Sequence, residues 1–208
     1  MTIDLTPERA VARLADLRFE GTFNPYAHQC PHHDLPDAPL IRRANLLATF
    51  AAAIGGVDAI WIALEPGHRG ARRTGLAMTD DRHLAAHGQR WGLVDIRRAT
   101  KSGPDTEQTA GIVWGALANS AQRVLLWNLF PLHCHLPGRP LTNRRHTRAE
   151  REACWDLTRG IVSMVKPSRI VAVGNDAHKA MAGIDPACVK VRHPSYGGKT
   201  DFLAGVTA

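Results

Sequence analysis

The sequence predicts an α/β fold, a three-layer α/β/α sandwich in which helices cover both faces of a central four-stranded parallel sheet. Two observations predict this class. Four short runs rich in valine, isoleucine and leucine lack polar alternation, as expected for strands that are covered on both faces. Stretches with helical spacing lie between these runs, and strands that alternate with helices form parallel sheets.

The first elements are a helix, a second helix and a strand. The sequence TPE begins the helix expected at residues 6–17, because threonine is a good helix cap and proline fits the first turn. A helix at residues 37–54 would gather leucine, isoleucine and alanine side chains on one side. The apolar run VDAIWIAL then predicts a buried strand at residues 57–64.

Three further pairs of a helix and a strand complete the predicted sheet. Each pair is a stretch with helical spacing followed by an apolar run: residues 106–119 with 123–128, 147–165 with 169–174, and 175–182 with 188–193. The last two helices end before Pro167 and Gly183, residue types that terminate helices.

Composition narrows the class of protein. The 208 residues suit one domain, residues 1–208, and a hydrophobic fraction of 44% excludes a disordered or fibrous chain. No apolar run reaches the roughly 20 residues of a membrane span, and no signal-peptide core is present. We therefore expect a cytoplasmic protein without a membrane partner. The net charge of +7 points to a polyanion such as nucleic acid.

Four loops are expected at one edge of the predicted sheet. Ligands of open parallel sheets bind at the carboxyl ends of the strands, so the residues that follow each strand are the candidates for a site. These loops are residues 65–70, 128–133, 174–176 and 193–199. Three of them carry polar side chains directly at the strand end.

The motifs in these loops resemble a known family. ALEPG, which contains Glu65, ends the first strand; LLWN, which ends at Asn128, is followed by an FPL sequence; and HPS begins at His193. Gly174 and Ala177 fit a Val-x-x-Gly-x-x-Ala turn. In this order the motifs resemble those of the uracil-DNA glycosylase superfamily, from about residue 23 to residue 202. The resemblance is to a branch without the cysteine spacing of an iron–sulfur cluster, and it implies that no cofactor is needed.

Glu65 and His193 are the candidate catalytic residues. Cleavage of an N-glycosidic bond leaves positive charge on the sugar and negative charge on the base, so a site needs an anion near C1′ and donors near the base oxygens. Glu65 can supply the anion or orient water, as carboxylates do in glycoside hydrolysis. Neutral His193 can donate an N–H to the base O2. A helix cap or ion pair for Glu65, and simple packing for His193, are the structural alternatives.

Asn128 is the third candidate catalytic residue and the candidate reader of the base. Its amide offers both a donor and an acceptor, which match the O4 and N3–H of uracil and also the equivalent edge of hypoxanthine. A turn-capping role is the alternative. The resemblance places Leu64, Gly67 and Met78 in the same base pocket. Gly67 leaves room near C5 of the base, whereas Met78 replaces a stacking phenylalanine and could equally be a core residue.

An enzyme that acts on a stacked base must flip it out of the helix, so DNA contacts are expected around the pocket. Tyr196 is the candidate wedge. The further candidates for DNA contact are His68, Arg69, Arg72, Arg73, Arg144, Arg145, Ser195 and Lys199. We expect a monomer that acts on uracil-containing DNA, single- or double-stranded.

The sequence thus predicts a monofunctional DNA glycosylase that acts on uracil, with other deaminated bases as further candidate substrates, and that leaves an abasic site. No lysine occupies a motif position, so strand cleavage through a Schiff base is not expected. One alternative is a metal-dependent hydrolase, with ligands drawn from Cys30, His32, His33, His133, Cys134 and His135. Another is a non-catalytic reader of damaged bases, which Met78 makes conceivable.

Overall fold

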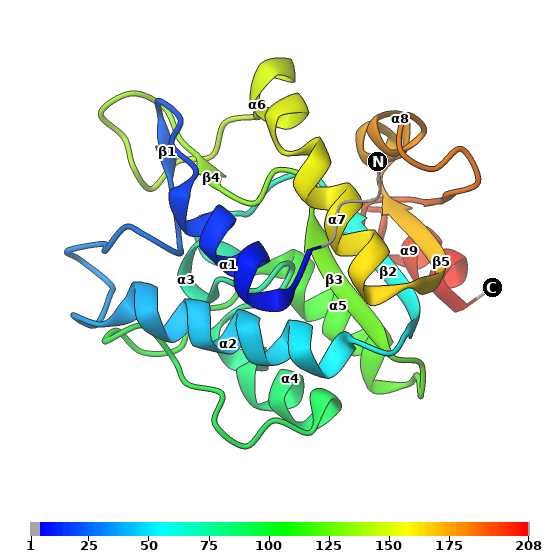
Figure 1. Ribbon diagram of the computed structural model, residues 1–208, viewed down its shortest axis with the longest axis horizontal. Coiled ribbons are helices and arrows are strands. Elements are labelled where there is room, and N and C mark those ends of the chain that lie inside the picture. Colours follow the sequence, from blue (N-terminus) through cyan, green and yellow to red (C-terminus); the bar gives the residue numbers. More distant parts are fainter. Residues whose placement is uncertain (1–4, 208) are drawn as a thin grey trace.

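A parallel sheet of four strands forms the centre of the computed structural model, which describes residues 5–207. The strand order is β3-β2-β5-β6, so the predicted α/β class and the four-stranded parallel sheet are confirmed (Figure 1). The strands are β2 (Val57–Ala63), β3 (Val124–Asn128), β5 (Pro167–Val173) and β6 (Val189–Val191).

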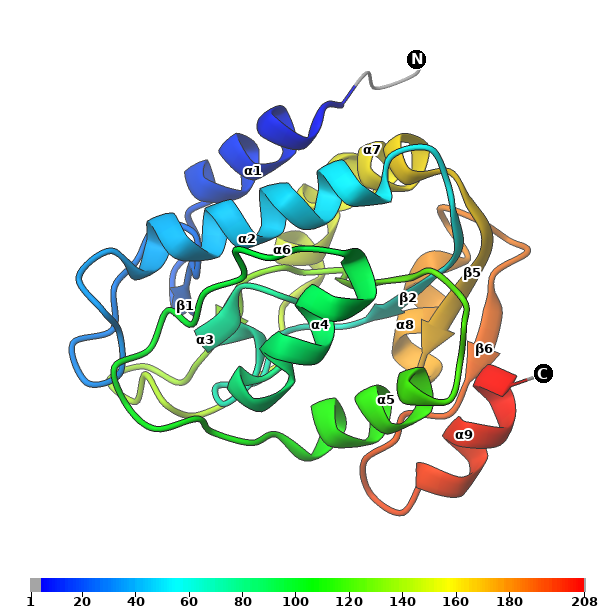
Figure 2. The same ribbon diagram turned by 90° about the horizontal axis from the view of Figure 1, so that it is seen from below.

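Helices cover both faces of this sheet. The helices are α1 (Pro7–Asp16), α2 (Ala38–Ala53), α3 (Ala71–Thr74), α4 (Leu84–Trp91), α5 (Gln108–Ala118), α6 (Arg148–Ala153), α7 (Trp155–Val165), α8 (Asn175–Met181) and α9 (Lys199–Thr207). Figure 2 shows α1, α2 and α7 on one side of the sheet and α5 and α9 on the other. Within residues 5–207, no helix combines the length and the apolar character that a membrane crossing needs.

The two faces of the sheet bury two separate clusters of apolar side chains. Ile60 and Ile62 of β2 pack into the cluster that includes residues of α1, α2 and α7. Trp61, which points to the opposite face because side chains alternate along a strand, packs with residues of α5 and α9. Its ring meets Phe202 of α9 edge to face, with the centroids 5.7 Å apart. Burial of both faces explains why β2 is an almost continuous apolar run.

The register of the sheet brings the ends of the strands together. Ala63 of β2 lies opposite Asn128 of β3, and Val173 of β5 lies opposite Val191 of β6. Backbone hydrogen bonds extend this order beyond the strands, since Leu129 N donates to Ala63 O at 2.9 Å. The loops that follow the four strands therefore start from one edge of the sheet.

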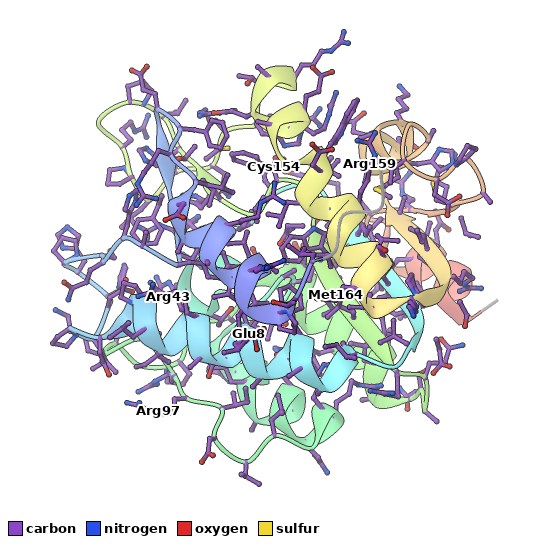
Figure 3. The ribbon with its side chains drawn as sticks, in the orientation of Figure 1. Glu8, Arg43, Arg97, Cys154, Arg159 and Met164 are labelled. Atoms are coloured by element: carbon purple, nitrogen blue, oxygen red, sulfur yellow. The ribbon has the colours of Figure 1, made fainter. Side chains whose placement is uncertain are left out.

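The predicted helix at residues 147–165 is divided in two, which corrects the expectation of one continuous helix. Thr147 and Glu150 form a capping box that starts α6, and α7 begins directly after Cys154. Cys154, labelled at this junction in Figure 3, is buried with Phe130 and Cys134 in a small separate cluster. The junction between α6 and α7 is therefore buried at Cys154, and α7 packs on the sheet.

Several elements were not predicted from the sequence. These are the short helices α3 and α4, a 3₁₀ turn (Asp81–His83), α9, and an antiparallel pair of β1 (Thr22–Phe23) with β4 (His133–Cys134). Helix α9 contains Gly205, a residue that disfavours helices. A Cβ atom there would lie 2.9 Å from Val191 Cγ1, so glycine permits the close packing of α9 on β6. Lys199, expected in a loop, is the first residue of α9.

Candidate active site

A pocket of about 520 Å³ opens at the edge of the sheet where the strands end. The three candidate catalytic residues, Glu65, Asn128 and His193, all line it, although they lie far apart in the sequence. The residues expected to form a base pocket, Leu64, Gly67, Met78 and Asn128, also line it. The structure therefore brings together the acid, the histidine and the amide in one cavity.

Glu65 is held by a histidine that sequence reasoning did not single out. The Nδ1 atom of His146 hydrogen-bonds to Oε2 of Glu65. The His146 side chain is only 5% exposed, and its ring packs against Phe130 with the centroids 5.8 Å apart. Among residues 5–207, Oε1 of Glu65 has no hydrogen-bond partner. The contact thus orients the carboxylate and leaves one of its oxygens for a ligand or water.

His193 is held as a hydrogen-bond donor. The backbone N–H of Ser195 donates to Nδ1 of His193 at 3.2 Å, so a proton on the neutral ring belongs on Nε2. Burial lowers the pKa of His193, and the nearby Glu65 only partly opposes this effect. Gly174, at φ 99°, allows His193 to pack closely against the backbone, because a Cβ atom at position 174 would lie 3.3 Å from His193 Cβ.

Asn128 is buried without a protein partner for its amide. The residue is 4% exposed and ends β3, yet its side chain makes no hydrogen bond to any other described residue. Buried amides in native proteins are normally paired, so an unpaired amide that lines a pocket is suited to a polar ligand. The turn-capping alternative has no supporting hydrogen bond within residues 5–207.

Met78 belongs both to the hydrophobic core and to the lining of the pocket. It is 4% exposed and packs with the cluster of α5 and α9, and it also lines the pocket. Its backbone is left-handed, at φ 48°, a conformation that is uncommon for residues other than glycine. Both interpretations of Met78 from the sequence therefore find a counterpart in the structure.

The space beside Gly67 is occupied, which corrects the expectation of free room there. A Cβ atom on Gly67 would overlap Oε1 of Glu107, and one on Gly70 would overlap Oε2. Glu107 directly precedes α5 and lines the pocket. Burial, with a smaller contribution from Asp80, raises the pKa of Glu107 to about 7. No pattern in the sequence indicated this carboxyl group.

The raised pKa of Glu107 predicts a pH-dependent cost to folding. The folded protein prefers the protonated acid, so the cost is small near the ordinary pKa of 4.5, grows with pH, and is constant above about pH 7. Glu107→Gln should therefore increase the free energy of unfolding by up to about 3 kcal/mol at pH 8.5. Urea unfolding of both proteins at pH 5 and 8.5 measures this; an equal difference at both pH values would contradict it.

Arg72 and Arg73 are not placed to meet phosphates, which corrects that expectation. Arg72 is 2% exposed, and its guanidinium carbon lies 3.9 Å from the centroid of the Phe23 ring. Arg73 is 5% exposed and forms an ion pair with Asp105, with Nη2 3.0 Å from Oδ2. Both arginines are therefore packed inside the molecule.

Arg144 and Arg145 border the pocket in different ways. Arg144 donates two hydrogen bonds to the Glu150 carboxylate, at 2.9 and 2.7 Å, and so ties the loop before α6 to that helix. Arg145 is exposed and pairs with Asp176, with Nη1 2.8 Å from Oδ2. Both line the pocket. Arg145 is therefore the more exposed of the two, although its charge is paired with Asp176.

The other candidates for DNA contact lie on loops or at a helix start. Arg69 and Lys199 are exposed, and His68 is partly buried, with its backbone N–H donating to Asn143 Oδ1 at 3.1 Å. Ser195 Oγ lies 3.1 Å from Thr109 Oγ1, which ties the HPS loop to α5. Tyr196 lines the pocket but is 96% exposed, so its ring projects into solvent.

The histidine and cysteine clusters do not form a metal site. Within the described part of the chain, no three His, Cys, Asp or Glu side chains are grouped so as to hold a metal ion. His133 is buried and its Nε2 hydrogen-bonds to Asn143 Oδ1 at 3.1 Å, while the four cysteines are buried and unbridged. The alternative of a metal-dependent hydrolase built on these residues has no supporting geometry.

Comparisons with known proteins extend to the fold only. No protein-family model matches the sequence, and no curated protein matches it. The structure is similar to the crystal structure of wild-type SMUG2 from Pedobacter heparinus, with a TM-score of 0.63 over 96% of this chain and 94% of that chain. The sequence identity is 12%. The chain therefore shares the overall fold of SMUG2.

Proposed function

We propose that this protein is a DNA glycosylase that hydrolyses the N-glycosidic bond of uracil in DNA and leaves an abasic site. The observation that carries the proposal is the meeting of Glu65, Asn128 and His193 in one pocket at the ends of three strands. The fold shared with SMUG2 supports it. Other deaminated bases that offer the same acceptor and donor edge, hypoxanthine among them, are further candidate substrates.

Recognition of the base rests on Asn128. A uracil flipped into the pocket presents O4 as an acceptor and N3–H as a donor, and one fixed amide can satisfy both. Cytosine presents the opposite pattern at this edge, so it would leave the Asn128 amide facing groups of the same kind. Because the amide has no protein partner among the described residues, it is available for this contact.

Hydrolysis rests on Glu65 and His193 acting at opposite ends of the breaking bond. The Glu65 carboxylate stabilises the positive charge that develops on the sugar and directs water to C1′. His146 keeps the carboxylate in position through its hydrogen bond. His193 donates from Nε2 to O2 of the uracil as negative charge grows there. A neutral donor suits this role, because it need not lose or regain a proton during the step.

The exposed residues around the pocket would hold the DNA strand. Tyr196 projects from the rim and would fill the space left by the extruded base. Arg69, Arg145 and Lys199 are exposed and would neutralise phosphates. No lysine lines the pocket within residues 5–207, so the proposed reaction ends at the abasic site without strand cleavage.

Incubation of the purified protein with an end-labelled oligonucleotide that contains one uracil tests the proposal. Alkali should then cleave the strand at the uracil position, whereas the product before alkali should have its full length. No cleavage at micromolar enzyme would overturn the proposal. Binding of the uracil oligonucleotide without any turnover would instead favour a reader of damaged bases.

The exposed cations predict a strong effect of salt. If Arg69, Arg145 and Lys199 each neutralise one phosphate of duplex DNA, kcat/KM should fall about 10- to 50-fold between 50 and 200 mM salt. Glutamine in place of Arg69 should make this dependence less steep, because one counterion fewer is released. Arg97, which lies below α2 in Figure 3, away from α6 and α8, provides the control. A salt dependence that Arg69→Gln and Arg97→Gln change equally would contradict the assignment.

A further inference from the structure

The carboxyl group of Glu107 forms part of the pocket wall, and hydrogen bonds hold the backbone around it. The backbone N–H of Glu107 donates to Asp80 Oδ2 at 2.8 Å, and the other oxygen of Asp80 accepts from His83 Nδ1 at 2.6 Å. Asp80 is fully buried. Two residues further along, Thr109 is tied to Ser195. The start of α5 is thus fixed on both sides, and the backbone of Glu107 is fixed with it.

The carboxyl group of Glu107 lies on two glycines. A Cβ atom at Gly67 or Gly70 would overlap its oxygens, so the carboxyl group lies directly against the backbone of both glycines. Among residues 5–207, neither oxygen has a hydrogen-bond partner. The carboxyl group therefore fills the space beside the two glycines.

The orientation of a bound pyrimidine determines which edge of its ring can lie near Gly67 and Glu107. In the proposed function, O2 of the base faces His193, while O4 and N3 face Asn128. The remaining edge, C5 and C6, faces neither of these residues, and Gly67 and Glu107 line the same pocket. We propose that Glu107 determines base specificity: its carboxyl group occupies the pocket beside C5 and excludes pyrimidines with an apolar C5 substituent, thymine above all.

The inference rests on the proposed function and is tested by rate ratios. Oligonucleotides would carry uracil, 5-fluorouracil, 5-bromouracil or thymine at one position, and excision would be measured in single turnover for the wild type and for Glu107→Ala. The alanine variant should raise the rate for thymine relative to uracil by about 10- to 200-fold. This is the usual factor by which a pocket discriminates between two substrates that differ by one methylene-sized group. 5-Bromouracil should show a similar increase and 5-fluorouracil little.

Two further variants separate size from charge. Glu107→Gln keeps the volume of the side chain and should leave the thymine to uracil ratio within about threefold of the wild type. Glu107→Asp withdraws the carboxyl group by one methylene and should raise the ratio partway. Each substituent alters the base as a leaving group equally in all four proteins, so the comparison of ratios isolates the pocket.

The outcomes distinguish this inference from the proposed function. Failure of the wild type to excise uracil would contradict the proposed function itself. Excision of uracil with a thymine to uracil ratio that neither Glu107→Ala nor Glu107→Asp changes would overturn the role of Glu107 alone. Circular dichroism and thermal unfolding identify a variant that does not fold, and the aspartate variant, which keeps the acid, then decides the question.

Discussion

Replacement of Glu65 by glutamine is expected to lower the rate of uracil excision by about 10²- to 10³-fold. Glutamine has nearly the same shape and can still hydrogen-bond to His146, so the pocket keeps its form. It removes the negative charge that would stabilise the cationic sugar, and an amide activates water poorly. Single-turnover rates with enzyme in excess over a uracil oligonucleotide measure the loss without interference from product release.

The matched control for this experiment is Glu8→Gln. Glu8, labelled on α1 in Figure 3, lies in the first turn of its helix and does not line the pocket. Its replacement removes the same charge from the surface and should leave the excision rate unchanged. A Glu65→Gln variant that excises uracil within about twofold of the wild-type rate would show that Glu65 has no part in the reaction.

His193→Ala is expected to reduce the rate by a similar factor, about 10²- to 10³-fold. The residue supplies a preorganised donor where negative charge develops, and the loss of one such donor removes transition-state stabilisation. The loss should be smaller for 5-fluorouracil than for uracil, because the fluorinated base carries negative charge more easily. This dependence on the leaving group distinguishes a donor to the base from a residue that only supports the loop.

Single-turnover rates of His193→Ala on both bases, measured beside wild type, provide the test. Glutamine at position 193 retains an N–H donor and should recover part of the uracil rate. An equal loss on uracil and 5-fluorouracil would contradict the role of His193 as the donor to O2, since a misfolded loop would slow both reactions alike.

The sheet could be predicted because its strands are buried on both faces. In β2, Ile60 and Trp61 must be apolar together although they point to opposite clusters, and this produces a continuous apolar run that sequence patterns detect. The small pair of β1 and β4 has two residues in each strand and offers no such pattern. Cys154, at the division between α6 and α7, is buried in one cluster with Phe130, and helical periodicity alone does not indicate such a contact.

The candidate site could be predicted to the extent that its residues follow strands. Glu65, Asn128 and His193 each stand at a strand end, and a parallel sheet brings such positions together. His146 lies 81 positions from Glu65 in a loop without pattern, and Glu107 reaches Gly67 only through folding. Their contribution is visible in the structure alone.

Arg72 and Arg73 were predicted from the sequence to contact DNA, and the structure shows that this prediction is wrong. Arg72 and Arg73 stand in a charged loop beside the predicted site, and charge at such a place suggests a surface that meets phosphates. The structure buries them, Arg72 over the ring of Phe23 and Arg73 beside Asp105. A sequence does not show that a ring or carboxylate from another segment will cover a charged residue, so net charge overstates the cations available to DNA.

Mass spectrometry of one uracil-containing oligonucleotide after incubation with the purified protein tests the central claim most directly. We expect the strand to lose the mass of uracil and gain that of water, with free uracil released in equal amount and the backbone intact. The same incubation with Glu65→Gln should give the product far more slowly. A strand of unchanged mass after prolonged incubation with the wild type would contradict the account.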